Sequence, residues 1–301
     1  MSDLRARSTW RRDSIGLFVV ATLYLVAGLA MAAFLVDSTA VGADLGTYQR
    51  ASRDLWDSGN PYLSAATVSE DFRYRYPPLL AMLRPLVDFA PAWYAILVVA
   101  SAVPIWLAVH SRGWIGVLPA LLLVGPWGQQ LLNGNAQAIV IALMALVPLS
   151  PRAGAVGLAV AAMLKLHPAL GVVWYIGRRQ WGSVAWFAGA TVVLLLVQVP
   201  WLPDFFGYYL TDTTATTTVA GLSLRAFGTP IWIIGLAVVG YLSYRYANGR
   251  WGWLLNVVWQ LVALPRVLLV NLALLLAAPF PRRPSIPASD AVERRARRPL
   301  F

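Results

Sequence analysis

Residues 180–201 read QWGSVAWFAGATVVLLLVQVPW, a run of 22 residues without a charged side chain. About 20 such residues allow an α-helix to cross the hydrocarbon core of a bilayer. A second run of this kind covers residues 15–36, and a shorter one covers residues 231–244. Because backbone groups in lipid must form their hydrogen bonds within a helix or a closed barrel, these runs predict membrane-spanning helices.

The composition also indicates a membrane protein with many spans. Hydrophobic residues make up 59% and charged residues 12% of the chain, against roughly 25% charged residues in soluble domains. With no cysteine and only two histidines, thiolate sites are excluded and a zinc site is disfavoured, so we expect no metal and no cofactor. The net charge of +11 comes from arginines at the ends of the chain and between apolar runs, a pattern typical of membrane topology rather than nucleic-acid binding.

Arginines set the orientation of the predicted all-α, polytopic bundle. Positions 5, 7, 11 and 12 are arginines that precede the first run, so residues 1–14 are predicted to be cytoplasmic. Residues 15–280 form the predicted membrane domain, with about nine or ten helices. Its first loop, residues 37–76, then lies outside the plasma membrane. The Pro-, Arg- and Ser-rich residues 281–301 are predicted to be a disordered basic tail.

The number of spans depends on three runs. Residues 77–110 are too many for one span, and Asp88 and Pro91 predict a turn between two. With residues 154–176 as one span, this count places arginines 178, 179, 245 and 250 inside and arginines 112 and 152 outside. Residues 251–279 form either one helix or two short ones broken at Pro265. The break returns the basic tail to the cytoplasm, as the positive-inside rule favours.

The outer loop at residues 37–76 is dense in Asp, Arg, Tyr and Trp. From Asp44 to Trp56 its apolar residues recur at helical spacing, and residues 59–61, Gly-Asn-Pro, end the pattern, which predicts a helix lying on the membrane surface. Asp44 begins that helix, and its carboxylate has two interpretations. It caps the helix by accepting backbone N–H groups, or it is a catalytic base facing an outer cavity.

Several short motifs follow one another in order over roughly residues 40–200. They comprise an Asp with a Tyr four residues on, a Gly-x-Pro-Tyr turn, a Tyr-x-Tyr-Pro-Pro-Leu run, a polar Asn-Gly-Asn-Ala-Gln segment, and a Lys-x-x-Pro helix end followed by a basic turn. Their positions are Asp44 and Tyr48; Gly59, Pro61 and Tyr62; Tyr74, Tyr76, Pro77, Pro78 and Leu79; residues 133–137; Lys165 and Pro168; and Arg178, Arg179 and Trp181. The ordered set resembles glycosyltransferase family 87, the polyprenyl-phosphate-mannose-dependent α-mannosyltransferases of the GT-C superfamily.

The resemblance implies a GT-C-like bundle and an inverting sugar transfer. An acceptor hydroxyl attacks the anomeric carbon of a sugar carried on a polyprenyl phosphate, and an outer-loop Asp, matched by Asp44, removes the hydroxyl proton. The implied reaction is metal-independent, and the lipid-linked sugar is a substrate rather than a cofactor. The chain departs from the family in two respects. Asn135 and Gln137 exchange the places of Gln and Asn in a Gly-Gln-x-Asn motif, and the chain is shorter than typical members.

Basic residues near the outer face are candidates to bind the donor phosphate. Arg73, Arg75 and Arg84 flank the Pro-Pro entry to the next apolar run. A guanidinium suits a phosphate, but snorkelling toward lipid headgroups explains these residues equally well. Arg225 follows a Thr-rich outer loop and is a further candidate, because a charge within a span usually has a partner or a function.

Lys165 and His167 lie within an apolar run, near mid-membrane by the span count. They bind substrate, or they pair with Asn135, Gln137 or a carbonyl. The neighbouring acidic pairs 54/57 and 70/71 are expected to form ion pairs with arginines rather than a cation site. The predicted substrate-binding set is Tyr48, Tyr62, Arg73, Arg75, Tyr76, Arg84, Asn135, Gln137, Lys165, His167 and Arg225.

The sequence therefore predicts a membrane enzyme with Asp44 as general base. By resemblance, it moves a hexose, with mannose as the expected sugar, from a polyprenyl phosphate to an envelope glycolipid or glycan at the outer face of the plasma membrane. The alternative is a non-catalytic membrane protein, either a sugar-lipid transporter or a shortened, inactive relative that serves as a subunit. Polar residues spread along several spans would favour transport, whereas here they gather at one outer face.

Overall fold

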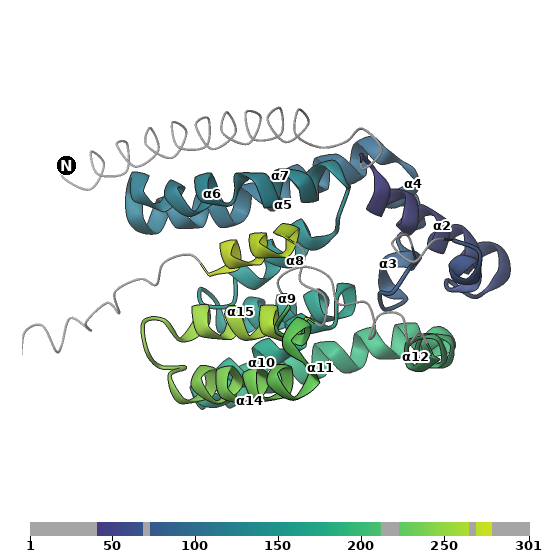
Figure 1. The fold of residues 1–301 in the computed structure, drawn as a ribbon. Coiled ribbons are helices and arrows are strands. Elements are labelled where there is room, and N and C mark those ends of the chain that lie inside the picture. The colour runs from purple at the N-terminus through teal and green to yellow at the C-terminus, as the bar shows by residue number, and fades with distance from the viewer. Residues whose placement is uncertain (1–40, 69–72, 212–222, 265–268, 279–301) are drawn as a thin grey trace, which may run out of the picture.

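The computed structural model describes residues 41–68, 73–211, 223–264 and 269–278 (Figure 1). Within these ranges every regular element is an α-helix or a 3₁₀-helix (η), so the predicted all-α class is confirmed for this part of the chain. The predicted span at 15–36 and the predicted tail at 281–301 lie outside the described residues. The elements are α2 Ala43–Ser58, η2 Leu63–Ala66, α3 Leu79–Met82, α4 Arg84–Asp88, α5 Ala90–Arg112, η4 Gly113–Val117, α6 Leu118–Leu122, α7 Val124–Leu132, α8 Gln137–Ala145, α9 Pro151–Leu164, η5 His167–Gly171, α10 Val172–Gly177, α11 Trp181–Gln198, η6 Val199–Trp201, α12 Leu202–Thr211, η7 Leu224–Phe227, α14 Thr229–Arg245, α15 Gly252–Ala263 and η8 Leu269–Ala277.

Helix α2 forms where the outer-loop sequence predicts a helix. It ends at Gly59, whose φ of 80° lies in the left-handed region that glycine adopts without strain. On its exposed face, the side chain of Trp56 is 60% exposed. The buried side chains recur every three or four positions, as one face of a helix requires: Leu45, Thr47, Tyr48, Ala51, Ser52 and Leu55.

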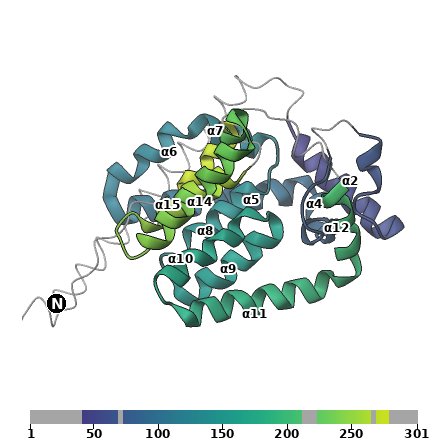
Figure 2. The ribbon, with the colours of Figure 1, turned by 60° about the horizontal axis from the view of Figure 1, so that its bottom comes forward.

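The molecule has two distinct ends. Helices α2, α3, α4 and α12 gather at one of them, which we call the α2 end, and the turn between α14 and α15 lies at the other, which we call the arginine end (Figure 1). At the α2 end, the backbone N–H of Leu79 donates to Gln198, the last residue of α11, at 2.8 Å. At the arginine end, Arg178 donates to the carbonyl of Ala247 at 3.4 Å. Figure 2 shows α11 along one edge of the bundle, leading to α12 on the side of α2.

The predicted pair of spans at residues 77–110 is wrong. The chain forms two short helices, α3 with four residues and α4 with five, and then one long helix, α5, with 23. Helix α4 packs against α2, where Gln49 Nε2 donates to the carbonyl of Val87 at 2.9 Å. Pro91 lies in the first turn of α5. A proline there sacrifices no helical hydrogen bond, so it begins the long helix instead of separating two spans.

The predicted single span at residues 154–176 is also wrong. Helix α9 ends at Leu164, Lys165 is extended with φ −150° and ψ 131°, and η5 begins two residues later. Pro168 lacks the N–H that would donate to the Leu164 carbonyl in a continuous helix, which explains why α9 ends at Leu164 and a separate helix follows. Lys165 therefore lies at the α2 end rather than midway along a helix. The start of α9 lies beside α10, because a Cβ at Gly154 would be 2.9 Å from Tyr175 Oη.

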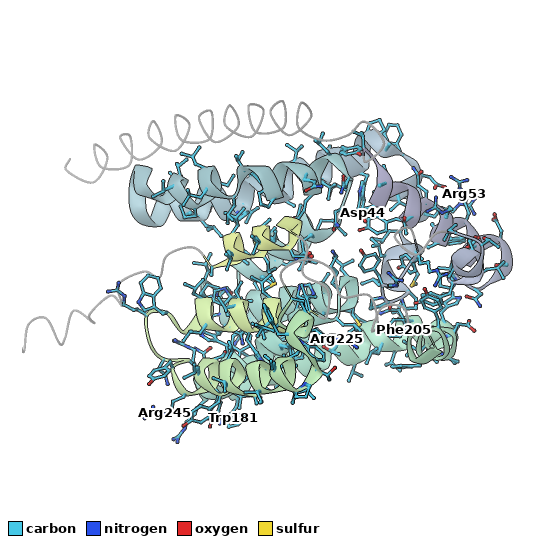
Figure 3. All side chains as sticks on the ribbon, viewed as in Figure 1. Asp44, Arg53, Trp181, Phe205, Arg225 and Arg245 are labelled. Carbon is cyan, nitrogen blue, oxygen red and sulfur yellow. The ribbon has the colours of Figure 1, made fainter. Side chains whose placement is uncertain are left out.

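The first error adds one crossing of the bundle and the second removes one, so the predicted side of each residue beyond 165 is unaffected. Between the two errors, however, two arginines lie at the opposite end from the one predicted. Helix α5 leaves the α2 end at Ala90, so Arg112 is at its far end, and Arg152 is at the start of α9. Both positions join Arg178 at the arginine end instead of opposing it. In Figure 3, Arg245 also lies at this end, far from Asp44.

Two helices among the described residues, Ala90–His110 and Trp181–Tyr208, are long and apolar enough to cross a membrane. Helices α9 and α15 are apolar but have 14 and 12 residues. A bundle of nine or ten spans therefore stays a prediction. Of the two alternatives for residues 251–279, the structure has the two-segment form: Trp253 Nε1, near the start of α15, donates to the carbonyl of Ala277, at the end of η8, at 2.8 Å. Pro265 lies outside the described residues.

Candidate functional site

The start of α2 is fixed by the loop between α7 and α8. The backbone N–H groups of Asp44 and Leu45 both donate to the carbonyl of Asn133, at 3.0 and 3.1 Å. Such first-turn N–H groups have no partner within their own helix. Gly134 allows the close approach, since its φ is 71° and a Cβ there would lie 2.7 Å from the Cβ of Leu45. Trp93 Nε1 holds the loop from α5 by donating to the carbonyl of Gly134 at 2.8 Å.

Three polar side chains meet at this junction, and we call them the Asp44 cluster: Asp44, Asn135 and Lys165. Asn135 Nδ2 donates to Asp44 Oδ2 at 2.9 Å. Lys165 Nζ donates to Asn135 Oδ1 at 3.0 Å. The backbone N–H of Gln137 donates to the same Asn135 oxygen at 2.8 Å. The predicted pairing of Lys165 with Asn135 is therefore present, and it joins residues from α2, the loop before α8 and the end of α9.

The environment of Asp44 excludes one of its two interpretations. Gly42, not Asp44, is the N-cap of α2, and no side chain caps that helix end. Asp44 is the second residue of the helix, and its carboxylate accepts from the Asn135 side chain instead. Burial raises the pKa of the carboxyl above its ordinary value, against the smaller lowering effects of Lys165 and Asn135. The cap prediction is wrong, and the interpretation as a base remains.

Aromatic rings surround the cluster. Tyr48 is fully buried, and its ring meets those of Tyr76 and Trp93 edge-on at centroid distances of 5.6 and 5.8 Å. The hydroxyl oxygen of Tyr48 accepts from the backbone N–H of Ala136 at 3.3 Å. Lys165 Nζ lies 5.2 Å from the centre of the Tyr76 ring, a cation–π distance. Tyr48 therefore packs behind the cluster, while Tyr76 contacts its lysine directly.

Tyr62 connects the outer loop to α12. Its hydroxyl donates to the carbonyl of Tyr76 at 2.8 Å. Its ring stacks on Tyr208 at 5.1 Å with an angle of 14° between the planes. Because Tyr62 is buried at 6% exposure, it supports the position of Tyr76 rather than presenting a free ring.

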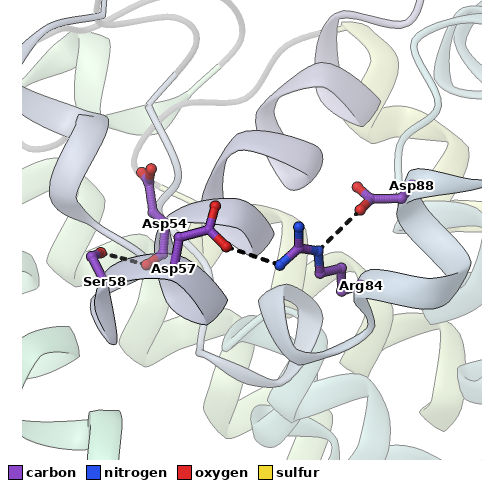
Figure 4. Close-up of polar contacts among 5 residues, drawn as sticks. All are labelled: Asp54, Asp57, Ser58, Arg84 and Asp88. Carbon is purple, nitrogen blue, oxygen red and sulfur yellow. Dashed lines mark hydrogen bonds and ion pairs between the residues drawn. The ribbon is translucent and has the colours of Figure 1, made fainter.

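Arg84 lies apart from the Asp44 cluster. Figure 4 shows its guanidinium between two surface carboxylates: Nη1 is 3.1 Å from Asp57 Oδ1, and Nε is 3.2 Å from Asp88 Oδ2. Asp54 instead accepts the backbone N–H of Ser64 at 3.0 Å. The expected surface ion pairing is thus present for Asp57. Within the described ranges, no group of three or more His, Cys, Asp or Glu side chains is arranged to hold a metal ion.

The other predicted site residues divide into near and distant ones. Arg73 and Arg75 lie in the segment that leads to Tyr76, and both are partly exposed. His167 is next to the cluster and interacts electrostatically with Lys165. Arg225 is on η7, with its guanidinium 5.6 Å from the Trp232 ring of α14. In Figure 3 it lies between the two ends, away from Asp44.

Three residues that hold the α2 end were not among the site residues predicted from the sequence. Gly134 sits in an Asn-Gly turn, whose signal for φ above zero is visible in the sequence. Gln198 is a buried polar residue near the end of an apolar run, a signal that usually marks a partner. Trp93 carries no local signal, because its donor function depends on a carbonyl 41 residues away.

The fold and the cluster together define a class. The described chain is an all-helical protein with two helices able to cross a membrane and a partly buried Asp–Asn–Lys cluster at one end. The model of glycosyltransferase family 87 matches residues 74–295. Since this is more than half of the chain, the protein belongs to glycosyltransferase family 87, and the resemblance found in the sequence is confirmed at the level of the family.

The matched residues include Asn135 and Lys165 but begin after Asp44 and Tyr48. The family match therefore says nothing about the role of Asp44. No curated protein matches the chain, and no solved structure matches it.

Proposed function

We propose that the protein transfers a hexose from a polyprenyl-phosphate carrier to a glycan or glycolipid acceptor at the outer face of the plasma membrane, with Asp44 as general base. Membership of glycosyltransferase family 87 supports the transfer of a sugar. The identity of the sugar as mannose and the inverting course of the reaction rest on the resemblance in sequence.

One observation carries the assignment of Asp44. Its Oδ2 is occupied by the Asn135 amide, while Oδ1 has no hydrogen-bond partner among the described residues. Burial raises the pKa of this carboxyl, and a more basic carboxylate is better suited to take a proton from a hydroxyl. A half-buried carboxylate with one fixed and one available oxygen is suited to general-base catalysis.

The proposed step uses Oδ1 as the proton acceptor. The acceptor hydroxyl oxygen forms a bond to the anomeric carbon while its proton moves to Asp44. The bond between that carbon and the carrier phosphate breaks, and the polyprenyl phosphate leaves with the electron pair. Arg73 and Arg75, beside Tyr76, are the cations proposed to bind the donor phosphate. Arg84 is not part of this proposal, because its guanidinium lies apart from the Asp44 cluster, between Asp57 and Asp88.

The positions of the arginines support a membrane orientation. Six arginine positions belong to the arginine end, 112, 152, 178, 179, 245 and 250, against five at the α2 end, 50, 53, 73, 75 and 84, so the positive-inside rule favours a cytoplasmic arginine end. The Asp44 cluster then faces outward. This distribution fits the rule better than the one predicted from sequence alone, in which two of these six arginines were external.

The test is transfer from a radiolabelled polyprenyl-phosphate hexose in membranes that contain the Asp44→Asn variant. General-base catalysis typically supplies about 10² to 10⁴ in rate, so we expect a loss of that order with normal expression. Asp57→Asn on the same helix is the matched control, and its exposed ion pair is worth at most about 1 kcal/mol. Undiminished transfer by Asp44→Asn refutes the assignment of the base, and no transfer by the wild type under any donor supports the non-catalytic alternative.

A further inference from the structure

The Asn135 amide can have only one orientation. Its Oδ1 faces two groups that donate hydrogen bonds, Lys165 Nζ at 3.0 Å and the backbone N–H of Gln137 at 2.8 Å. A rotated amide would present its own N–H groups to both donors and its oxygen to a carboxylate. The rotation would replace three hydrogen bonds with three repulsive contacts, two between donors and one between oxygens. Nδ2 must therefore face Asp44.

This orientation distinguishes the two oxygens of Asp44. Oδ2 always faces an N–H donor, and a proton on that oxygen would weaken this hydrogen bond, because a neutral hydroxyl oxygen is a poorer acceptor than a carboxylate oxygen. Oδ1 is then the oxygen that binds the transferred proton. Because the Asp44 backbone N–H also donates to Asn133, both the backbone and the carboxylate of Asp44 are held by the loop before α8.

We propose that Asn135 and Lys165 are positioning residues for Asp44: Lys165 fixes the Asn135 amide, and the amide fixes which Asp44 oxygen acts as the base. The inference rests on the proposed function of Asp44. It gives Lys165 a role different from substrate binding. It also explains the exchange in the Gly-Gln-x-Asn motif, where Asn135 stands at the place of the family's longer Gln. The shorter Asn fits the 2.9 and 3.0 Å contacts on its two sides.

Lys165 also acts on Asp44 through its charge. The titratable groups that face Asp44 are Lys165 from the end of α9, Tyr48 on its own helix, Tyr76 from the segment before α3 and Tyr94 from α5. Burial and the Asp44 charge both raise the pKa of Tyr48 and of Tyr76, so these two side chains stay neutral. Lys165 is therefore the cation that stabilises the Asp44 carboxylate among the described residues.

The experiment measures kcat/KM against pH for the wild type, Lys165→Met and Lys165→Arg. Activity requires ionised Asp44, so it falls as pH drops through the pKa of that carboxyl. Loss of the lysine charge raises the pKa further, and we expect the acid limb of Lys165→Met to move up by roughly one pH unit. Lys165→Arg keeps the charge, and its limb should stay at the wild-type position even where its activity is lower.

Asn135→Asp provides a second variant in case Lys165→Met does not fold. It keeps an oxygen for Lys165 and Gln137 but places a carboxylate against Asp44, which should move the acid limb upward by more than one pH unit. Unmoved limbs in both Lys165→Met and Asn135→Asp would overturn the inference. A raised KM for Lys165→Met with an unmoved limb would instead return Lys165 to substrate binding. Full activity of Asp44→Asn refutes the proposed base itself, so the two failures are distinguishable.

Discussion

Gly134 is the position where a single methyl group should separate α2 from the rest of the site. Its φ is 71°, and a Cβ there would lie 2.7 Å from the Cβ of Leu45 and 3.3 Å from Tyr94 Oη. Gly59 provides a matched control on the other end of the same helix. Its φ is 80°, but a Cβ there would meet nothing within 4 Å.

Both substitutions to alanine carry the same backbone cost, about 1 to 2 kcal/mol for a non-glycine residue in the left-handed region. Only Gly134→Ala adds a steric conflict. Ordinary carbon contacts are about 3.5 to 4.0 Å, so Leu45 and the start of α2 must move by roughly 1 Å. A displacement of about 1 Å in a catalytic group can reduce the rate by roughly 10²-fold. We expect that loss of kcat/KM for Gly134→Ala and less than a threefold loss for Gly59→Ala.

The assay is sugar transfer in membranes, combined with the thermal midpoint of the purified protein in detergent. Gly134→Ala should have the lower midpoint of the two, because it alone adds a steric conflict, and it should also have the lower activity. Equal activities would show that the contact between Gly134 and Leu45 does not position Asp44, and the reasoning about the docked helix would then be wrong.

Two further predictions concern buried hydrogen bonds that hold the α2 end. Trp93→Phe leaves the Gly134 carbonyl without its donor and should lower the free energy of unfolding by about 1 to 3 kcal/mol, whereas Trp56→Phe, at an exposed position, should change it by less than about 0.5 kcal/mol. Gln198→Leu removes the acceptor of the Leu79 N–H and should cost a similar 1 to 3 kcal/mol. Denaturant titration followed by tryptophan fluorescence measures the stability of Gln198→Leu, and limited proteolysis measures that of the two tryptophan variants. Unchanged stability of Trp93→Phe or Gln198→Leu would contradict the corresponding hydrogen bond.

The limits of α2 illustrate what local sequence can predict. Its apolar spacing and the Gly59–Pro61 stop act within a few residues, so the helix forms where expected. The cap assignment failed by two residues because the carbonyl of Asn133, 89 positions further along the chain, accepts the N–H of Asp44. A propensity for Asp at helix starts contains no information about such a distant acceptor.

The span count failed for a related reason. Pro91 and Pro168 both lie in the first turn of the helix that follows them, α5 and η5. A proline marks a helix boundary in the sequence, but it does not say whether the segments on its two sides are long enough to be separate spans. Contacts of neighbouring elements, such as Gln49 with Val87, decide which short segments turn back along the surface.

The sequence by itself determined that the chain is helical and apolar, where α2 lies, and that it belongs with family 87 glycosyltransferases. Only the tertiary structure brought Asp44, Asn135 and Lys165 together, across separations of 91 and 30 residues. Helical periodicity reports which face of one element is buried. It does not report which ends of different helices meet, and that meeting places the amide and the lysine beside the carboxylate.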